Sequence, residues 1–217
     1  MSSASNPADL SEHAAAEFAQ LKSLDHLASV AEALESNGIQ AFVVPSGAEA
    51  RSLVASLIPR GSEVFNNTSR TLEAIGVADD IERSGRYEPL RVRLFQMDRE
   101  MQAREMRILA AAPEYVVGSV HAVTDMGSLL VASASGSQLG PIVSGAERVI
   151  FVIGGQKIVP DLDAGIRRLY EYSLPLEDRR AREAYGVSSG VNNILVINRV
   201  VAPDRVTAIL VHEVLGF

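Results

Sequence analysis

The feature that most constrains the fold is a series of short apolar runs in the second half of the chain. The runs "EYVVGSV" (114–120), "SLLVASA" (128–134) and "RVIFVIGG" (148–155) are β-branched and bounded by glycines and small polar residues. Strands that are buried on both faces have this composition, whereas strands with one solvated face alternate apolar and polar residues. Other elements must therefore cover both faces of the sheet.

Helical patterns lie between the apolar runs. The segment "SGAEARSLVASLIP" (46–59) follows the short strand "QAFVVP" (40–45), and "PDLDAGIRRLYEY" (160–172) follows the third run. Two last strands, "NNILVINR" (192–199) and "VTAILVHE" (206–213), close the chain. About seven strands thus alternate with about six helices, which predicts an α/β fold with a largely parallel sheet flanked by helices.

The N-terminal region predicts helix over residues 11–37, broken near Ser23 and ended by Asn37-Gly38. We expect residues 1–38 to form a helical segment that packs on the core. Residues 39–217 are then a single α/β domain, because no linker longer than a turn interrupts them. The apolar surface on the N-terminal helices predicts a homodimer.

Composition excludes several classes of function. The net charge is −7 with scattered Lys and Arg, which argues against nucleic acid as a partner. No apolar run approaches the roughly 20 residues that a membrane crossing needs, and the first residues lack a signal-peptide pattern, so we expect a cytoplasmic protein. The chain has no cysteine, and its four histidines lack metal-ligand spacing, so we assign no metal; which cofactor the protein uses, if any, is unknown from sequence. Any redox role must rest on a partner or an unidentified cofactor.

Polar loops at the carboxyl ends of strands are the candidate ligand sites, because ligands of open α/β sheets bind there. The first loop follows the strand "EVFN" and could hold a phosphate or carboxylate with its hydroxyls, amides and one guanidinium. Taken alone, the same string favours the simpler interpretation, a turn that only caps the next helix. The anion-binding candidates of this loop are Asn66, Asn67, Thr68, Ser69 and Thr71.

Two further loops carry small polar residues. In "AVTDMGS" (122–128), Asp125 is the only charged residue; it is a candidate for proton transfer or for accepting a ribose hydroxyl, or else an ordinary turn former. The loop "SASGSQLGP" (133–141) precedes an apparent helix, and its glycine spacing matches neither the dinucleotide-binding fingerprint nor the Walker A loop. The ligand candidates of these two loops are Thr124, Gly127, Ser128, Ser135, Gly136 and Ser137.

The segment "GGQKIVPD" (154–161) places Lys157 and Asp161 just beyond a buried strand. Lys157 could add positive charge at the rim of a ligand site. The simpler interpretation, a solvated lysine followed by an acid at a helix start, is favoured by the local string alone.

Four segments in series, "NNTSRTLEAIG", "AVTDMGSLLVASASGSQLGP", "VIFVIGGQKIVPDLDAGIRRL" and "VTAILVHEVLGF", resemble the LUD-domain family of lactate-utilisation proteins. The resemblance runs from about residue 40 to the end. The segment "LPLEDRRAREAYGVSSGVNNILVINR" looks like the short, stand-alone branch of that family.

The resemblance implies a fold similar to the ribose-phosphate isomerase, glucosamine-phosphate deaminase and CoA-transferase group, whose loops hold anionic ligands. It favours the anion-binding interpretation of the first loop. It also implies a role in oxidation of L-lactate to pyruvate, as a non-redox component beside iron–sulfur subunits. The absence of cysteine fits such a component.

The chain departs from the family pattern at two places. Met126 stands where this branch commonly has a second acid beside Asp125, and Asn193 stands where related sequences often carry a lysine. Three hypotheses follow: a lactate-utilisation component with an anion site, a stand-alone enzyme on a phosphosugar or acyl-CoA, and a regulatory or scaffold subunit with a vestigial pocket. Whether the protein is an enzyme stays open from sequence.

Overall fold

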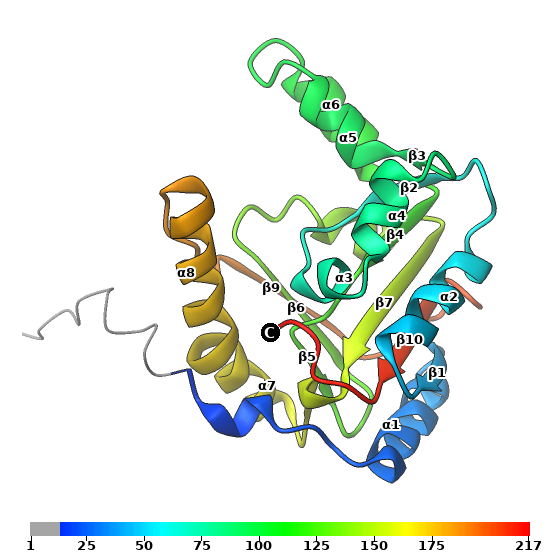
Figure 1. The fold of residues 1–217 in the computed structure, drawn as a ribbon, viewed down its shortest axis with the longest axis vertical. Coiled ribbons are helices and arrows are strands. Elements are labelled where there is room, and N and C mark those ends of the chain that lie inside the picture. The colour runs from blue at the N-terminus through cyan, green and yellow to red at the C-terminus, as the bar shows by residue number, and fades with distance from the viewer. Residues whose placement is uncertain (1–13) are drawn as a thin grey trace, which may run out of the picture.

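The computed structural model describes residues 14–217; the start of the predicted N-terminal helix at 11–13, with His13, lies outside the described residues. Six strands form a sheet in which all neighbours are parallel, in the order β1-β10-β7-β4-β2-β3 (Figure 1). The α/β class is thereby confirmed. The strands of this large sheet are β1 (Gln40–Val44), β2 (Glu63–Asn66), β3 (Glu88–Pro89), β4 (Tyr115–Gly118), β7 (Arg148–Gly154) and β10 (Val206–Val211).

A second, smaller sheet has the order β8-β5-β6-β9 and is mixed. Strand β6 pairs antiparallel with both β5 and β9, and β5 pairs parallel with β8. The sequence did not separate this sheet from the large one, because a strand buried on both faces has the same pattern in either. Its strands are β5 (Ala122–Thr124), β6 (Leu129–Ser133), β8 (Ile158–Val159) and β9 (Asn193–Ile197).

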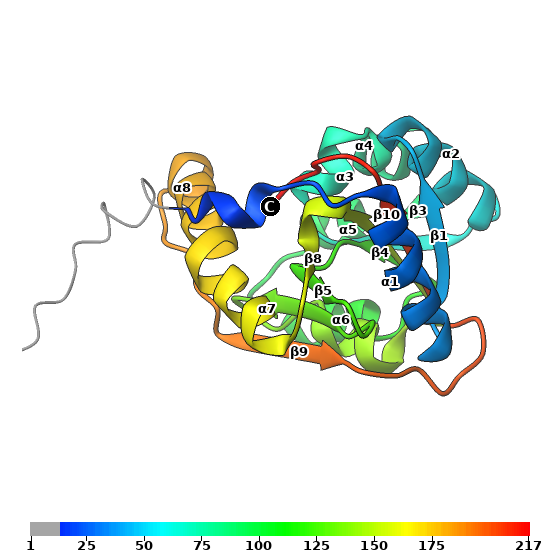
Figure 2. The ribbon, with the colours of Figure 1, turned by 90° about the horizontal axis from the view of Figure 1, so that it is seen from below.

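Helices α2, α3 and α4 cover the outer face of the large sheet, and α7 packs on the outer face of the small one. Figure 2 shows α7 and β9 on the opposite side of the molecule from α2, α3 and α4. None of the helices between residues 14 and 217 combines the length and apolar character that a membrane crossing requires. The helices are α1 (Leu24–Ser36), α2 (Gly47–Leu57), α3 (Arg70–Ala74), α4 (Val77–Arg83), α5 (Leu90–Gln96), α6 (Ala103–Ala111), α7 (Leu162–Arg168) and α8 (Leu174–Tyr185).

Three apolar clusters hold the layers together. Alternate residues of β7 divide between two of them: Phe151 packs with α1 and the small sheet, whereas Val152 packs with α2, α3 and α4. The third cluster joins the outer face of the small sheet to the segment around Leu169 and Tyr172. Strands β5, β6 and β8 of the small sheet are thus buried on both faces, whereas the edge strand β9 is partly exposed.

Local signals place the helix boundaries. Ser23 accepts a hydrogen bond from the backbone N–H of His26 and begins α1, which confirms the predicted break there. Ser46 accepts the backbone N–H of Glu49 at 3.3 Å and begins α2, and its hydroxyl donates to Glu49 Oε1 at 3.4 Å. The helix expected after the third loop is present as a single π-helical turn, Pro141–Gly145.

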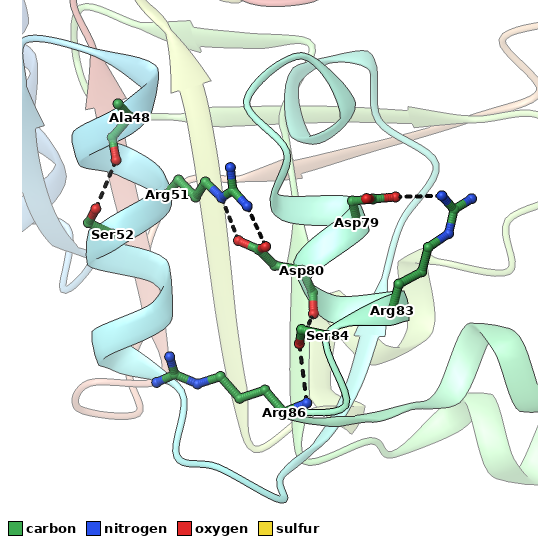
Figure 3. Close-up of polar contacts among 8 residues, drawn as sticks. All are labelled: Ala48, Arg51, Ser52, Asp79, Asp80, Arg83, Ser84 and Arg86. Carbon is green, nitrogen blue, oxygen red and sulfur yellow. Dashed lines mark hydrogen bonds and ion pairs between the residues drawn. The ribbon is translucent and has the colours of Figure 1, made fainter.

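Ion pairs join the helices on the outer face of the large sheet. Arg51 of α2 forms a bidentate pair with Asp80 of α4, at 2.6 Å from Nε and 2.5 Å from Nη2 (Figure 3). Within α4, Asp79 pairs with Arg83 at 3.0 Å. The Arg51 bridge fixes how the two helices lie against each other.

Candidate functional site

A cavity of about 280 Å³ lies at the carboxyl ends of β2, β4 and β7. Because these strands are parallel neighbours, the segments that follow them meet at one edge of the sheet. Those segments supply one wall: Asn67, Thr68, Ser69, Arg70, Thr71, Ser119, Val120, His121 and Lys157. The facing wall includes Ser133, Ser135, Ser137, Gln138, Ser173, Glu177, Arg180 and Ser189.

Lys157 is buried at this cavity, with 2% of its surface exposed. Its Nζ donates to Thr71 Oγ1 at 3.0 Å, to Ser119 Oγ at 3.1 Å and to the Val120 carbonyl at 3.1 Å. Burial, and then the charge of Arg168, lower the pKa of Lys157 well below its ordinary value. The interpretation of Lys157 as a solvated lysine is therefore wrong, and its charge lies within the protein rather than at a rim.

Arg168 lies behind the cavity and is fully buried. Its guanidinium donates to the His121 carbonyl and to Ser173 Oγ and stacks on the Tyr172 ring at 4.9 Å. Its Nε and Nη2 have no hydrogen-bond partner within residues 14–217. Burial lowers the pKa of Arg168 to about 10, so it stays a cation at neutral pH.

His121 lines the cavity between these two cations. Its Nδ1 accepts the backbone N–H of Ala132 at 3.1 Å, so the proton of the neutral ring sits on Nε2. Burial, and then the charges of Lys157 and Arg168, lower the pKa of His121 to about 3. The ring is neutral at physiological pH and can donate one hydrogen bond from Nε2.

The first loop acts both as a helix cap and as a cavity wall. Ser69 accepts the backbone N–H of Leu72 and begins α3, as the simpler interpretation expects. Thr68 and Thr71 line the cavity as well. Asn66 does not, because its Nδ2 donates to Glu82 Oε1 at 2.7 Å instead.

Asn67 is the unusual member of the first loop. The residue is 6% exposed and lines the cavity, yet neither its Nδ2 nor its Oδ1 has a partner within residues 14–217. The carboxamide packs on Gly118, where a Cβ would come within 2.8 Å of Nδ2. An unpaired buried amide costs about 1–3 kcal/mol, so this position is maintained at the expense of stability.

The third loop also reaches the cavity. Ser135 and Ser137 line it, and their hydroxyls lie 2.9 Å apart. Gly136 adopts a φ of +77°, which lets its N–H bond Ser133 Oγ at 2.9 Å and turns the chain back toward β9. Asn193 supports this turn by donating to the Ser133 carbonyl at 3.3 Å.

The second loop lies elsewhere, and its candidates Thr124, Asp125, Gly127 and Ser128 do not line the cavity. Asp125 pairs with His26 of α1 at 2.7 Å, and Asn37 donates to the carbonyl of Met126, whose side chain is exposed. These contacts join α1 to the turn between β5 and β6. The role of Asp125 in proton transfer stays a prediction, and the cavity's own chemistry does not include it.

The charges around the cavity are predominantly positive. Glu177 is the one carboxylate among the lining side chains of residues 14–217, and it pairs with Arg180 at 2.6 Å. Arg70 pairs with Glu73, whereas Lys157 and Arg168 contact no carboxylate of residues 14–217. No group of three potential metal ligands occurs within residues 14–217. The arrangement fits an anion rather than a metal ion.

Sequence reasoning missed several site residues. Ser119 and His121 follow β4, which is adjacent to β2, so the carboxyl-edge argument applied to the run "EYVVGSV" could have located them. No sequence pattern distinguishes Arg168 from its neighbour Arg167. Both lie in the predicted helix 160–172, yet Arg167 is exposed and Arg168 is buried. The wall from α8 could be found only from the structure.

The fold and the cavity define an α/β protein with an anion-compatible pocket at the carboxyl edge of a parallel sheet. The family model described as "LUD domain" matches residues 27–211. The chain therefore belongs to the LUD-domain family, which confirms the resemblance. Its fold is similar to the crystal structure of a DUF162 family protein from Deinococcus radiodurans, with a TM-score of 0.55 and 12% identity over 88% of this chain and 99% of that one. No curated protein matches the sequence significantly.

Proposed function

We propose that this protein binds a small organic anion in the cavity and serves the utilisation of lactate or related 2-hydroxy acids, as a non-redox component beside iron–sulfur subunits. The observation that carries the anion site is the pair of buried basic side chains, Lys157 and Arg168, neither of which contacts a carboxylate within residues 14–217. Buried charges are normally paired, because an uncompensated charge in a protein interior is costly. A bound anion supplies the missing countercharge.

Protonation of Lys157 is coupled to binding under this proposal. An anion beside the ammonium group favours its charged form and raises its pKa, opposing the effect of burial. Binding then takes up a proton, and affinity falls as pH rises above the pKa of Lys157 in the free protein. The hydrogen bonds to Thr71, Ser119 and Val120 match the three donors of an ammonium group.

The LUD family supports the metabolic part of the proposal through the resemblance described above. The chain has no cysteine to ligate an iron–sulfur cluster, so under this proposal such clusters belong to partner subunits. A second candidate function is favoured by the cavity itself. Its volume of about 280 Å³ exceeds what a six-atom acid such as lactate fills, and nine serine or threonine residues line it. A polyhydroxylated anion such as a phosphosugar matches such a wall, which keeps a stand-alone enzyme as the alternative.

A thermal-shift screen tests both candidates. The purified protein is heated with L-lactate, pyruvate, phosphosugars, acyl-CoA esters or nucleotides, and we expect at least one anion to raise the melting temperature. The shift should vanish in Lys157→Met and persist in Asp125→Asn, which is outside the cavity. If no anion in the screen raises the melting temperature, the anion site is refuted; a phosphosugar that binds while lactate and pyruvate do not would favour the alternative.

A further inference from the structure

The helices α5 and α6 and the turn between them, residues 90–111, form an arm that projects from the body of the molecule (Figure 1). Helix α6 buries none of its side chains. Three large apolar side chains of the arm are exposed: Phe95 by 63%, Met101 by 83% and Ile108 by 56%. Large apolar side chains gathered on one projecting element mark an interaction surface rather than ordinary scatter.

The tip of the arm is a well-bonded turn. Asp98 Oδ1 accepts the backbone N–H groups of Glu100 at 2.8 Å and Met101 at 3.0 Å, and the Asp98 N–H donates to Gln102 Oε1 at 3.0 Å. Arg99 stacks on the Phe95 ring at 5.9 Å and fixes the tip to α5. Met101 is therefore held outward by a specific structure.

The arm has the opposite charge from the rest of the chain. Residues 90–111 contain five arginines and three acidic residues, a net charge of +2 in a chain of −7. The remainder therefore carries −9. An arm of this charge is attracted to the body of another copy of the same chain.

A groove of about 270 Å³ lies at the base of the arm. Its acidic and apolar side chains complement the basic and apolar side chains of the arm. Glu63 and Glu88, which are partners in the register of β2 and β3, supply two carboxylates. Tyr87, Pro89 and Leu90 supply apolar wall, and Arg93 of α5 also lines the groove, so that its two carboxylates outnumber its basic side chain. The edge strand β3 borders this groove, so the sheet ends there.

We propose that two copies of this chain pair through their arms, antiparallel about a two-fold axis, with the tip of each arm in the base groove of the other. The tip and the groove lie at opposite ends of one arm. When two arms pair antiparallel, the tip of each copy therefore meets the groove of the other copy. Such an interface is self-complementary, as closed dimers require. Arg99 and Arg104 then face Glu63 and Glu88, and Met101 contacts the apolar wall.

This interface differs from the one expected from the N-terminal helices. Leu27, Val30 and Leu34 of α1 belong to the main core cluster of their own chain, which leaves Leu24 of this helix, 48% exposed, as its large apolar side chain at the surface. The large apolar side chains of the arm are more exposed than Leu24.

Sedimentation velocity and light scattering of the full chain test the proposal. We expect a dimer whose fraction rises with concentration up to about 0.1 mM. The tip variant Arg99→Glu/Arg104→Glu and the base variant Glu63→Lys/Glu88→Arg should each raise the dissociation constant at least about tenfold, because like charges then meet. Arg199→Glu and Glu183→Arg, which reverse exposed charges outside the arm, should leave it unchanged.

A mixture of the tip variant and the base variant gives the decisive result. In a heterodimer, the acidic tip of the tip variant meets the basic groove of the base variant, and the basic tip of the base variant meets the acidic groove of the tip variant. We therefore expect the mixture to dimerise although neither variant does so alone. Circular dichroism and melting temperatures verify that both variants are folded, and Met101→Ser tests the tip without a change of charge. A wild-type chain that stays monomeric, or a dimer that the tip variant, the base variant and Met101→Ser all leave intact, would overturn the proposal.

Discussion

At the scale of single residues, the basic side chains Lys157 and Arg168 are buried at the cavity, where apolar side chains would cost less free energy. Lys157 ionises in the unfolded chain near its ordinary pKa, whereas burial depresses that pKa in the folded chain. Between the two pKa values the unfolded state binds more protons, so stability rises with pH in that window. The ligand-free protein is therefore expected to become more stable as pH rises from neutral toward the ordinary pKa of lysine.

The variant Lys157→Met isolates this effect. We expect the free energy of unfolding of the wild type, minus that of the variant, to rise with pH by up to about 1.4 kcal/mol per unit. Urea unfolding from pH 7 to pH 9.5 measures it. A difference that is flat over this range would show that Lys157 stays protonated in the folded protein.

Asn67 and Asn66 allow a comparison of the cost of unpaired amide atoms, because both amide atoms of Asn67 but only Oδ1 of Asn66 lack a partner within residues 14–217. Asn67→Leu removes two buried polar atoms without partners, so we expect it to leave stability unchanged or raise it by about 1 kcal/mol, while abolishing the ligand-induced melting shift. Asn66→Leu removes the hydrogen bond to Glu82 and should destabilise. Chemical unfolding and the thermal-shift screen measure both. If Asn67→Leu kept the ligand shift, Asn67 would have no part in binding.

The adjacent asparagines also show how far sequence reasoning reaches. Their position after a buried strand predicted that the loop faces the carboxyl edge, and the structure places Asn67 at the cavity. The opposite fates of the two amides depend on Glu82 and Gly118, which are distant in sequence. A local pattern predicts the site's location, whereas the partner of each side chain depends on contacts between segments.

At the scale of elements, the same limit explains the second sheet. Strands β6 and β9 are about 60 residues apart and pair antiparallel, so no local signal relates them. The apolar runs correctly predicted strands buried on both faces and a parallel α/β core. They could not show that the loop with Asp125 turns toward α1, where His26 meets it, instead of toward the cavity.

Helix α1 is expected to be part of the core rather than an attachment to it. Leu34 is fully buried in the main core cluster, whereas Leu24 at the start of the same helix is 48% exposed. Leu34→Ala should lower the free energy of unfolding by about 2–5 kcal/mol, and Leu24→Ala by less than about 1 kcal/mol. Urea unfolding measures both. Equal, small losses would show that residues up to 38 form a separable segment.

At the scale of the whole molecule, the two sheets share one apolar core. Val123 and Leu129 of the small sheet pack in the same cluster as Val149 and Phe151 of the large sheet. The cavity lies between the carboxyl edge of the large sheet and the layer formed by the small sheet and α8. Its geometry therefore depends on both sheets being folded together.

We accordingly expect the protein to unfold in a single cooperative transition. Exposing the shared cluster on one sheet removes the buried surface of the other, so a state with only one sheet folded loses much of the core. Far-ultraviolet circular dichroism and tyrosine fluorescence should give the same urea midpoint, and a bound anion should move both midpoints together. Separate midpoints, or an anion that shifts only one probe, would show that the small sheet and α8 form an independent unit that closes over the site.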